Sequence, residues 1–223
     1  MASVSADGAI RPQVGALLSA CIAGNGSAAH PYFASDELLR GPDAARNLSD
    51  AVHFLCALHG RHPGILDHAL ERTVEPSARK WLERTAEAFA DERRLLARLA
   101  VAAGPVPGTP GGSASEAAVV NQRSAVATLA CSERRGCPLG AALGLVADWG
   151  QVRKVLGLAG RRLGVDPAPS SLPDPDTIPA VAQAAAGGVA FERALLFGAE
   201  QILVQHHGLW ALLEARASAR AAL

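Results

Sequence analysis

The segment FERALLFGAEQILVQHHGLWALLE, residues 191–214, carries apolar residues on most sides of a predicted helix. At about 100° per residue, one stripe of this helix contains Phe191, Leu195, Gly198, Ile202, Leu209 and Leu213. A second side is covered by Leu196, Leu203 and Val204. A helix that is apolar on nearly all sides is usually buried in the centre of a fold. We therefore expect the other helices of the chain to surround this segment.

Polar side chains interrupt the apolar pattern of this helix at Glu192, Glu200, Gln201, Gln205, His206 and His207. His206 falls inside the main stripe, four residues after Ile202. Glu200 and His207 lie two turns apart, and the helical period places both on the second apolar side. Buried polar groups need hydrogen-bond partners, and buried charges need them more strongly. The surrounding helices are expected to supply these partners.

The composition of the chain favours helices. Its 223 residues include 47 alanines, and aromatic residues make up only 4%, whereas strands prefer aromatic and β-branched residues. The sequence predicts an all-α fold, a single antiparallel bundle of six to nine helices around a buried C-terminal helix. We expect residues 1–11 to be disordered and residues 12–216 to form one domain. Glycine and proline indicate a flexible connector at 104–112 and a loop at 166–179.

Charge and cysteine usage exclude several classes of protein. Lys+Arg and Asp+Glu both number 21, so no basic surface is expected to bind nucleic acid. The four cysteines show no C-x-x-C spacing and are typical of buried thiols. No apolar run reaches the roughly 20 residues that a membrane span needs. The box Leu18-Ser19-Ala20-Cys21 resembles a lipoprotein processing site, but the apolar run before it is too short for a signal. We expect a cytoplasmic bacterial protein.

The densest cluster of functional side chains is HGRHPG, residues 59–64. One interpretation is structural, because Gly60 could end one helix and Pro63 could begin the next. The alternative is a loop that presents His59, Arg61 and His62 at the edge of a ligand pocket. The helix after this loop is expected to turn His68 outward, and the helix before it to turn Asp50 toward solvent.

A second candidate site combines Glu92, Glu200, His206 and His207. Glu92 falls within the apolar stripe of the helix predicted from Pro76 to Gly104, where a carboxylate must find a cation or have a raised pKa. Di-iron and di-manganese bundles hold their metals with inward Glu and Glu-x-x-His side chains. The four residues could bind iron or manganese in this way, or His206 or His207 could bind haem, although the two Glu-x-x-His pairs are absent.

No phosphate-binding glycine loop, nucleophile elbow or H-E-x-x-H motif occurs, so the sequence does not decide whether the chain is an enzyme. The stretch NLSDAVHFLCALHGRHPGILDHAL, residues 47–70, resembles uncharacterised bacterial protein families of unassigned function. The resemblance implies no active site. We interpret the chain as a non-enzymatic helical module that binds a small apolar ligand or a protein partner, and that could form a homodimer. The alternative is an oxidoreductase with a metal or haem in the bundle core.

Overall fold

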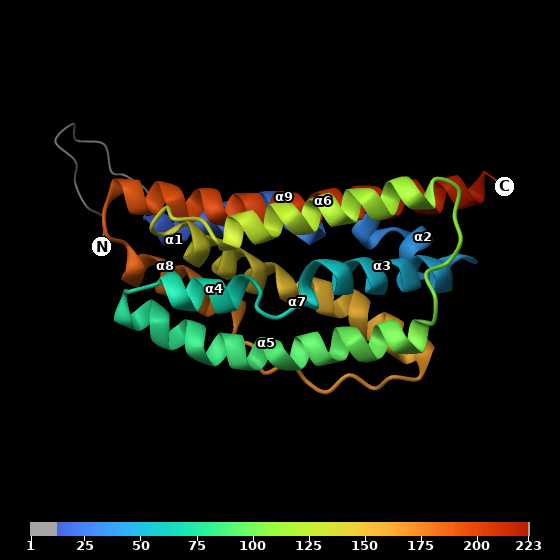
Figure 1. Cartoon of the computed structure of the whole chain (residues 1–223), viewed down its shortest axis with the longest axis horizontal. Coiled ribbons are helices and arrows are strands. Elements are labelled where there is room, and N and C mark those ends of the chain that lie inside the picture. The colour runs from blue at the N-terminus through green and yellow to red at the C-terminus, as the bar shows by residue number, and fades with distance from the viewer. Residues whose placement is uncertain (1–12, 223) are drawn as a thin grey trace.

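The computed structural model describes residues 13–222, and within this range it contains nine α-helices and no strand (Figure 1). The helices are α1 (Val14–Asn25), α2 (Asp36–Leu39), α3 (Ala44–His59), α4 (Ile65–Arg72), α5 (Pro76–Ala103), α6 (Gly112–Ala130), α7 (Cys137–Leu163), α8 (Ile178–Ala185) and α9 (Val189–Ala221). Short 3-10 turns are η1 (Ser27–Ala29), η2 (Pro31–Ala34) and η3 (Pro175–Thr177). The predicted all-α bundle is confirmed. The disorder expected for residues 1–11 concerns residues outside the described range.

Proline and glycine set the ends of the long helices. Pro76 occupies the first turn of α5, where its missing N–H would have no helical partner in any case. α5 ends at Gly104, whose φ of 72° lies in the left-handed region that glycine adopts without strain. α7 ends in the same way at Gly164, with a φ of 69°. These local signals account for the boundaries that the sequence predicts for α5.

The helices α7 and α9 form the central pair of the bundle. They run in the same direction, because α8 and the loop before it return the chain to the end at which α7 began (Figure 1). Glycine brings the two backbones together: a Cβ at Gly140 would lie 1.9 Å from the carbonyl oxygen of Leu195. A Cβ at Gly198 would lie 2.1 Å from the carbonyl oxygen of Cys137. The close crossing therefore depends on glycine in both helices.

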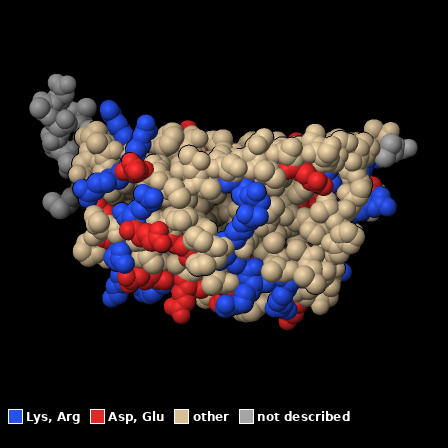
Figure 2. Space-filling model, in the orientation of Figure 1, with Lys and Arg blue, Asp and Glu red and all other residues tan. Residues whose placement is uncertain are grey.

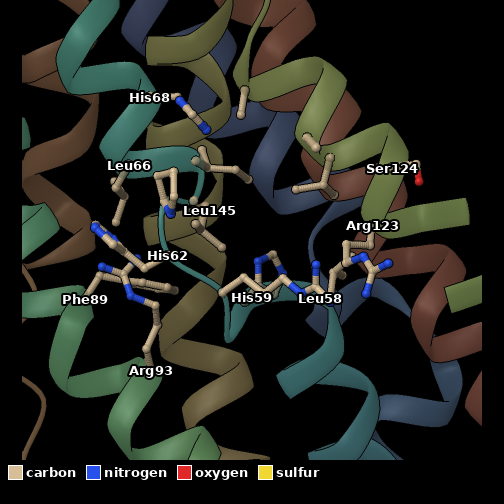
Figure 3. Close-up of a pocket in the computed structure, with 17 residues that line it drawn as sticks. Leu58, His59, His62, Leu66, His68, Phe89, Arg93, Arg123, Ser124 and Leu145 are labelled. Carbon is tan, nitrogen blue, oxygen red and sulfur yellow. The ribbon is translucent and has the colours of Figure 1, made fainter. Parts of the chain in front are cut away.

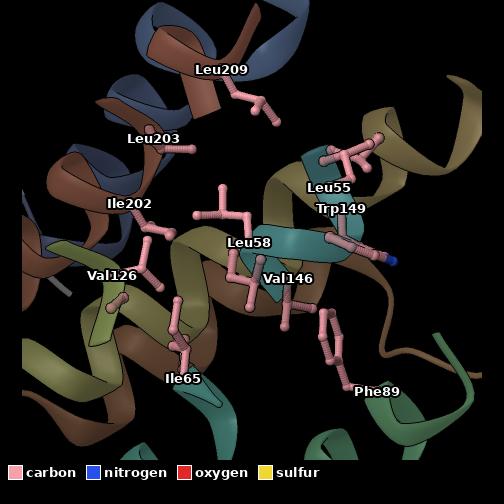
Figure 4. Close-up of a cluster of buried hydrophobic side chains, with 14 of the residues drawn as sticks. Leu55, Leu58, Ile65, Phe89, Val126, Val146, Trp149, Ile202, Leu203 and Leu209 are labelled. Carbon is pink, nitrogen blue, oxygen red and sulfur yellow. The ribbon is translucent and has the colours of Figure 1, made fainter. Parts of the chain in front are cut away.

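The hydrophobic core extends along α7 and receives side chains from the other long helices (Figure 4). Trp149 of α7 and Trp210 of α9 are fully buried. The opposite side of α9 is exposed and includes Phe197 and Val204, so α9 is less enclosed than α7. Within residues 13–222, no helix is long and apolar enough to cross a membrane.

The C-terminal end of α9 is fixed by a buried ion-pair cluster. Asp50 of α3 accepts hydrogen bonds from Nε and Nη2 of Arg216, each at 3.0 Å, and from Nη1 of Arg220 at 2.6 Å. Both arginines also donate to Thr109 in the connector between α5 and α6. The prediction that Asp50 faces solvent was wrong, because the end of α9 covers the side of α3 that carries it. Arg216 and Arg220 are both buried, at 2% and 8% exposed.

Candidate functional site

A cavity of about 350 Å³ opens between the loop at 59–64 and the helices α4, α5, α6 and α7 (Figure 3). Its apolar wall consists of Leu58, Ile65, Leu66, Phe89, Val126, Ala127, Ala130 and Leu145. Its polar wall consists of His59, Arg61, His62, His68, Arg93, Arg123 and Ser124. The space-filling view shows basic side chains beside a hollow near the middle of this face (Figure 2). The cavity therefore combines an apolar surface with a cationic one.

No aspartate or glutamate of the described chain lines this cavity. Asp67 lies outside the cavity and partly neutralises the positive charge of its wall, because Oδ2 of Asp67 accepts a hydrogen bond from Arg93 at 3.0 Å. The same oxygen accepts from the backbone N–H of Gly64 at 2.7 Å and lies 3.2 Å from Nδ1 of His62. Asp67 thus fixes the loop and one arginine. Arg61 and Arg123 form no ion pair with any residue from 13 to 222, so their charges are available to a ligand.

A buried chain of hydrogen bonds leads from the core to the cavity wall. Asp148 Oδ2 lies 2.6 Å from Nδ1 of His206, and Nε2 of His206 lies 2.9 Å from Nε2 of His59. Ser27 donates its backbone N–H to Oδ1 of Asp148 at 2.7 Å and its hydroxyl to Oδ2. The two histidines and Asp148 are each at most 6% exposed. Three helices, α3, α7 and α9, therefore meet in one polar chain that ends at the cavity.

Burial and charge shape the titration of this chain. Loss of hydration on burial, together with repulsion between His59 and His206 when both rings are charged, holds the pKa of His59 well below its ordinary value. Burial alone would raise the pKa of Asp148, but hydrogen bonds from His206 and Ser27 outweigh it and the pKa is lowered. His59 is thus kept as a neutral imidazole and Asp148 as a carboxylate at neutral pH.

Glu92 is buried as predicted, and its partners are protein groups. Its Oε2 accepts a hydrogen bond from Nε1 of Trp149 at 3.0 Å and lies 3.3 Å from Nε of Arg153. Its Oε1 accepts from the hydroxyl of Ser170 at 2.7 Å. The indole ring of Trp149 contacts the ring of His59 edge-on, with centroids 5.5 Å apart. Glu92 therefore holds the ring that supports His59.

The four residues of the predicted metal site are not brought together. Glu92 and His206 are buried in separate hydrogen-bonded groups, whereas Glu200 and His207 are exposed on the outer side of α9. The expected inward position of Glu200 and His207 was wrong, because the boundary of the core runs just beside Leu203. Leu203 is buried, but Glu200 and His207 lie about 40–60° further around the helix. Among residues 13–222, no three His, Cys, Asp or Glu side chains form a group that could hold a metal ion.

The cavity brings together all three residues of the other candidate set, His59, Arg61 and His62. Sequence reasoning did not group His68, Arg93 or Arg123 with them, and it missed Asp148 of the buried chain. His68 lines the cavity although an outward position was predicted, because α6 covers that side of α4. Asp148 was not selected, since nothing in its own helix indicates that His206, 58 residues away, is its partner. A signal existed for the histidines, because His59 and His206 both fall on apolar stripes and so need buried partners.

A search of curated proteins and a search of solved structures each find no match to this chain. A family model described as a family of unknown function, DUF6975, matches residues 22–221. The matched range includes the cavity, the buried histidine chain and the ion-pair cluster of α9. It also includes residues 47–70, whose resemblance to families of unassigned function is confirmed. The chain belongs to DUF6975, a family of unknown function.

Proposed function

We propose that the protein is a non-enzymatic binding module for a small organic anion with an apolar body. One observation carries this proposal: the cavity is lined by three arginines, three histidines and Ser124, by no described carboxylate, and otherwise by Gly64 and apolar side chains. Its volume of about 350 Å³ lies within the range of about 300–1,000 Å³ that is typical of small-molecule sites.

The arginines supply the recognition of charge. A guanidinium binds a carboxylate or a phosphate through two parallel hydrogen bonds, which makes arginine the usual residue for such anions. Arg93 is already oriented by Asp67, and Arg61 and Arg123 form no ion pair with the described residues. An apolar wall next to these charges excludes water and strengthens their attraction for an anion. A purely apolar ligand would leave these cations without a partner.

The apolar wall supplies the recognition of the ligand body. Leu66, Phe89, Val126 and Leu145 come from four different helices and are positioned by the packed core. Burial of an alkyl chain contributes about 0.8 kcal/mol per CH₂ group. A ligand with both an anionic head and an alkyl body therefore uses both walls.

Four compounds that share one alkyl chain test the proposal: octanoate, octyl phosphate, octanol and octylamine. By isothermal titration calorimetry, the two anions are expected to bind at least tenfold more tightly than octanol, and octylamine is expected not to bind. A charged hydrogen bond is worth about 1.5–3 kcal/mol, and about 1.4 kcal/mol corresponds to a tenfold change. Arg123→Gln should therefore weaken octanoate binding by about tenfold or more.

The control is Arg98→Gln, which removes an exposed arginine of α5 outside the cavity and should leave the affinity unchanged. Equal affinities for octanol and octanoate would contradict the anionic head, and the absence of binding by both anions would contradict the proposal as a whole.

Three broader expectations remain proposals. We propose one domain over residues 12–216, supported by a hydrophobic core whose members run from Val14 to Ala217. We propose a bacterial, cytoplasmic protein. A homodimer also stays a prediction, with the exposed apolar residues of α9 as its candidate surface.

A further inference from the structure

We infer that the cavity binds its anion together with one proton, and that the buried chain Asp148–His206–His59 carries this proton. In the bound state, Nδ1–H of His59 donates a hydrogen bond to the anionic head. This inference rests on the proposed function, because it requires an anion in the cavity. It goes further by assigning the ligand head to one nitrogen atom and by making the affinity depend on pH.

The geometry fixes the hydrogen on one ring. Both oxygens of Asp148 act as acceptors, since they receive the N–H and the hydroxyl of Ser27. Nδ1 of His206, 2.6 Å from Oδ2, must therefore carry a hydrogen and donate it. Nε2 of His206 and Nε2 of His59 are 2.9 Å apart, so one hydrogen lies between them. Only the position of that hydrogen, and the state of Nδ1 of His59, is left open.

Nδ1 of His59 is the end of the chain that faces the cavity. It makes no hydrogen bond with any residue of the described range. Nδ1 of His59 is not sealed within the core, although His59 as a whole is only 6% exposed. Because His59 lines the cavity, the remaining access of Nδ1 is through that space. A ligand in the cavity can therefore reach it.

The chain has two protonation states with opposite behaviour toward an anion. In the first, the shared hydrogen belongs to His59, and Nδ1 of His59 presents a lone pair that repels an anion. In the second, a proton from solvent has entered at Nδ1 of His59, and the hydrogen on Nε2 has passed to Nε2 of His206. His206 then carries both hydrogens beside Asp148, and Nδ1 of His59 is a donor. One proton is taken up, and no other bond changes.

Charge favours the second state once an anion is bound. With both histidines neutral, Asp148 is a buried negative charge, and a second anion nearby would repel it. With the added proton, Asp148 and His206 form a buried ion pair, and the repulsion is reduced. The lowered pKa of His59 agrees with this assignment, because it keeps the His59 ring neutral. By reciprocity, a proton that strengthens anion binding is itself bound more tightly when the anion is present.

Other titratable and charged groups face the same cavity, and the test must separate them from the buried chain. They are His68 on α4, Arg93 on α5, Arg123 on α6, and Arg61 and His62 in the loop. Behind Trp149, Glu92 is paired with Arg153 and does not contact either histidine. The ring of exposed His207 on α9 contacts the ring of His30, with centroids 4.5 Å apart. His62 and His68 are the groups that could take up a proton in place of the buried chain.

Proton uptake can be measured directly by titrating octanoate into the protein in buffers of different ionisation enthalpy. Across a series of pH values, we expect uptake to reach a maximum of about one proton per ligand. The affinity should fall as pH rises, by up to about tenfold per unit where uptake is maximal. Asp148→Asn removes the charge that stabilises the proton, so uptake should fall close to zero while the arginines still bind octanoate. If that variant does not fold, His59→Gln removes the donor and should have the same effect on uptake.

Two controls identify the carrier of the proton. The double variant His62→Gln/His68→Gln should retain the uptake, whatever its affinity for octanoate, and His207→Gln should change neither uptake nor affinity. Octanoate binding without proton uptake would overturn this inference alone. Uptake that persists in Asp148→Asn and disappears in the double variant would also overturn it, because His62 or His68 would then carry the proton. If neither octanoate nor octyl phosphate binds, the proposed function fails and this inference fails with it.

Discussion

Replacing Asp50 with alanine is expected to lower the free energy of unfolding by about 3–5 kcal/mol. Asp50 is the only carboxylate that pairs with Arg216 and Arg220 among the described residues, and the side chains of all three are at most 5% exposed. Its removal leaves two guanidinium groups buried without a counter-ion. Nη1 of Arg216 and Nε of Arg220 lack hydrogen-bond partners even when Asp50 is present. Removing Asp50 therefore increases the number of buried donors without an acceptor.

Urea denaturation followed by circular dichroism measures this loss. The matched control is Asp91→Ala, because Asp91 pairs with Arg94 on the surface of α5, where both side chains are more than half exposed. Surface ion pairs are worth about 0–1 kcal/mol, so the control should be nearly neutral. Similar small losses in both variants would show that the cluster does not hold α9 to α3.

Gly140→Ala is expected to destabilise the protein by about 3 kcal/mol, at the upper end of the range for overpacking. The added Cβ would lie 1.9 Å from the carbonyl oxygen of Leu195 and 2.6 Å from its carbonyl carbon. These are backbone atoms of α9, so no side-chain rotation relieves the contact. The central helices must move apart, and core contacts on both sides of the pair are then lost.

Gly150→Ala, in the same helix, is the matched variant. Nothing lies within 4 Å of a Cβ at Gly150, so this substitution should stabilise the protein by about 0.4–1 kcal/mol through the lower entropy of the unfolded chain. Thermal unfolding of both variants decides the matter. Melting temperatures that change in the same direction would contradict the role assigned to the close crossing.

Local signals in the sequence predicted the helices well. Pro76 and Gly104 mark the ends of α5, and the apolar stripe of that helix correctly includes the buried Glu92. His206 was expected inside because it interrupts an apolar stripe, and it is buried. His59 was predicted at the edge of a pocket, and it is buried where it lines the cavity. Periodicity succeeds here because it reports which side of one helix faces the core.

Contacts between distant segments were not predictable from periodicity. Asp50 was assigned to solvent because only one face of α3 carries large apolar residues, yet α9 covers the opposite face from 166 residues away. The predicted domain ended at residue 216, because the partners of Arg216 and Arg220 are recognised only in the folded chain. Glu200 was predicted to face the core but is exposed. The helices packed against α9 decide how much of its surface is buried, and the sequence of α9 alone does not show this.

The cavity shows the same limit. His59, Arg61 and His62 are close in sequence, were grouped as one candidate set, and line one cavity. Arg93 and Arg123 complete the cationic wall from α5 and α6, and no local pattern links these helices to the loop. The chemistry of the site therefore became apparent only when all five residues were placed around one space.

The most direct test of the anion site uses the imidazole ¹⁵N signals of the seven histidines, recorded with and without saturating octanoate. His59, His62 and His68 line the cavity, whereas His30, His53 and His207 do not. Single His→Gln variants assign the signals. The proposed site predicts that octanoate shifts the signals of the three cavity histidines and leaves those of His30, His53 and His207 in place. Unchanged cavity signals, or shifts at His30 and His207 in their stead, would contradict it.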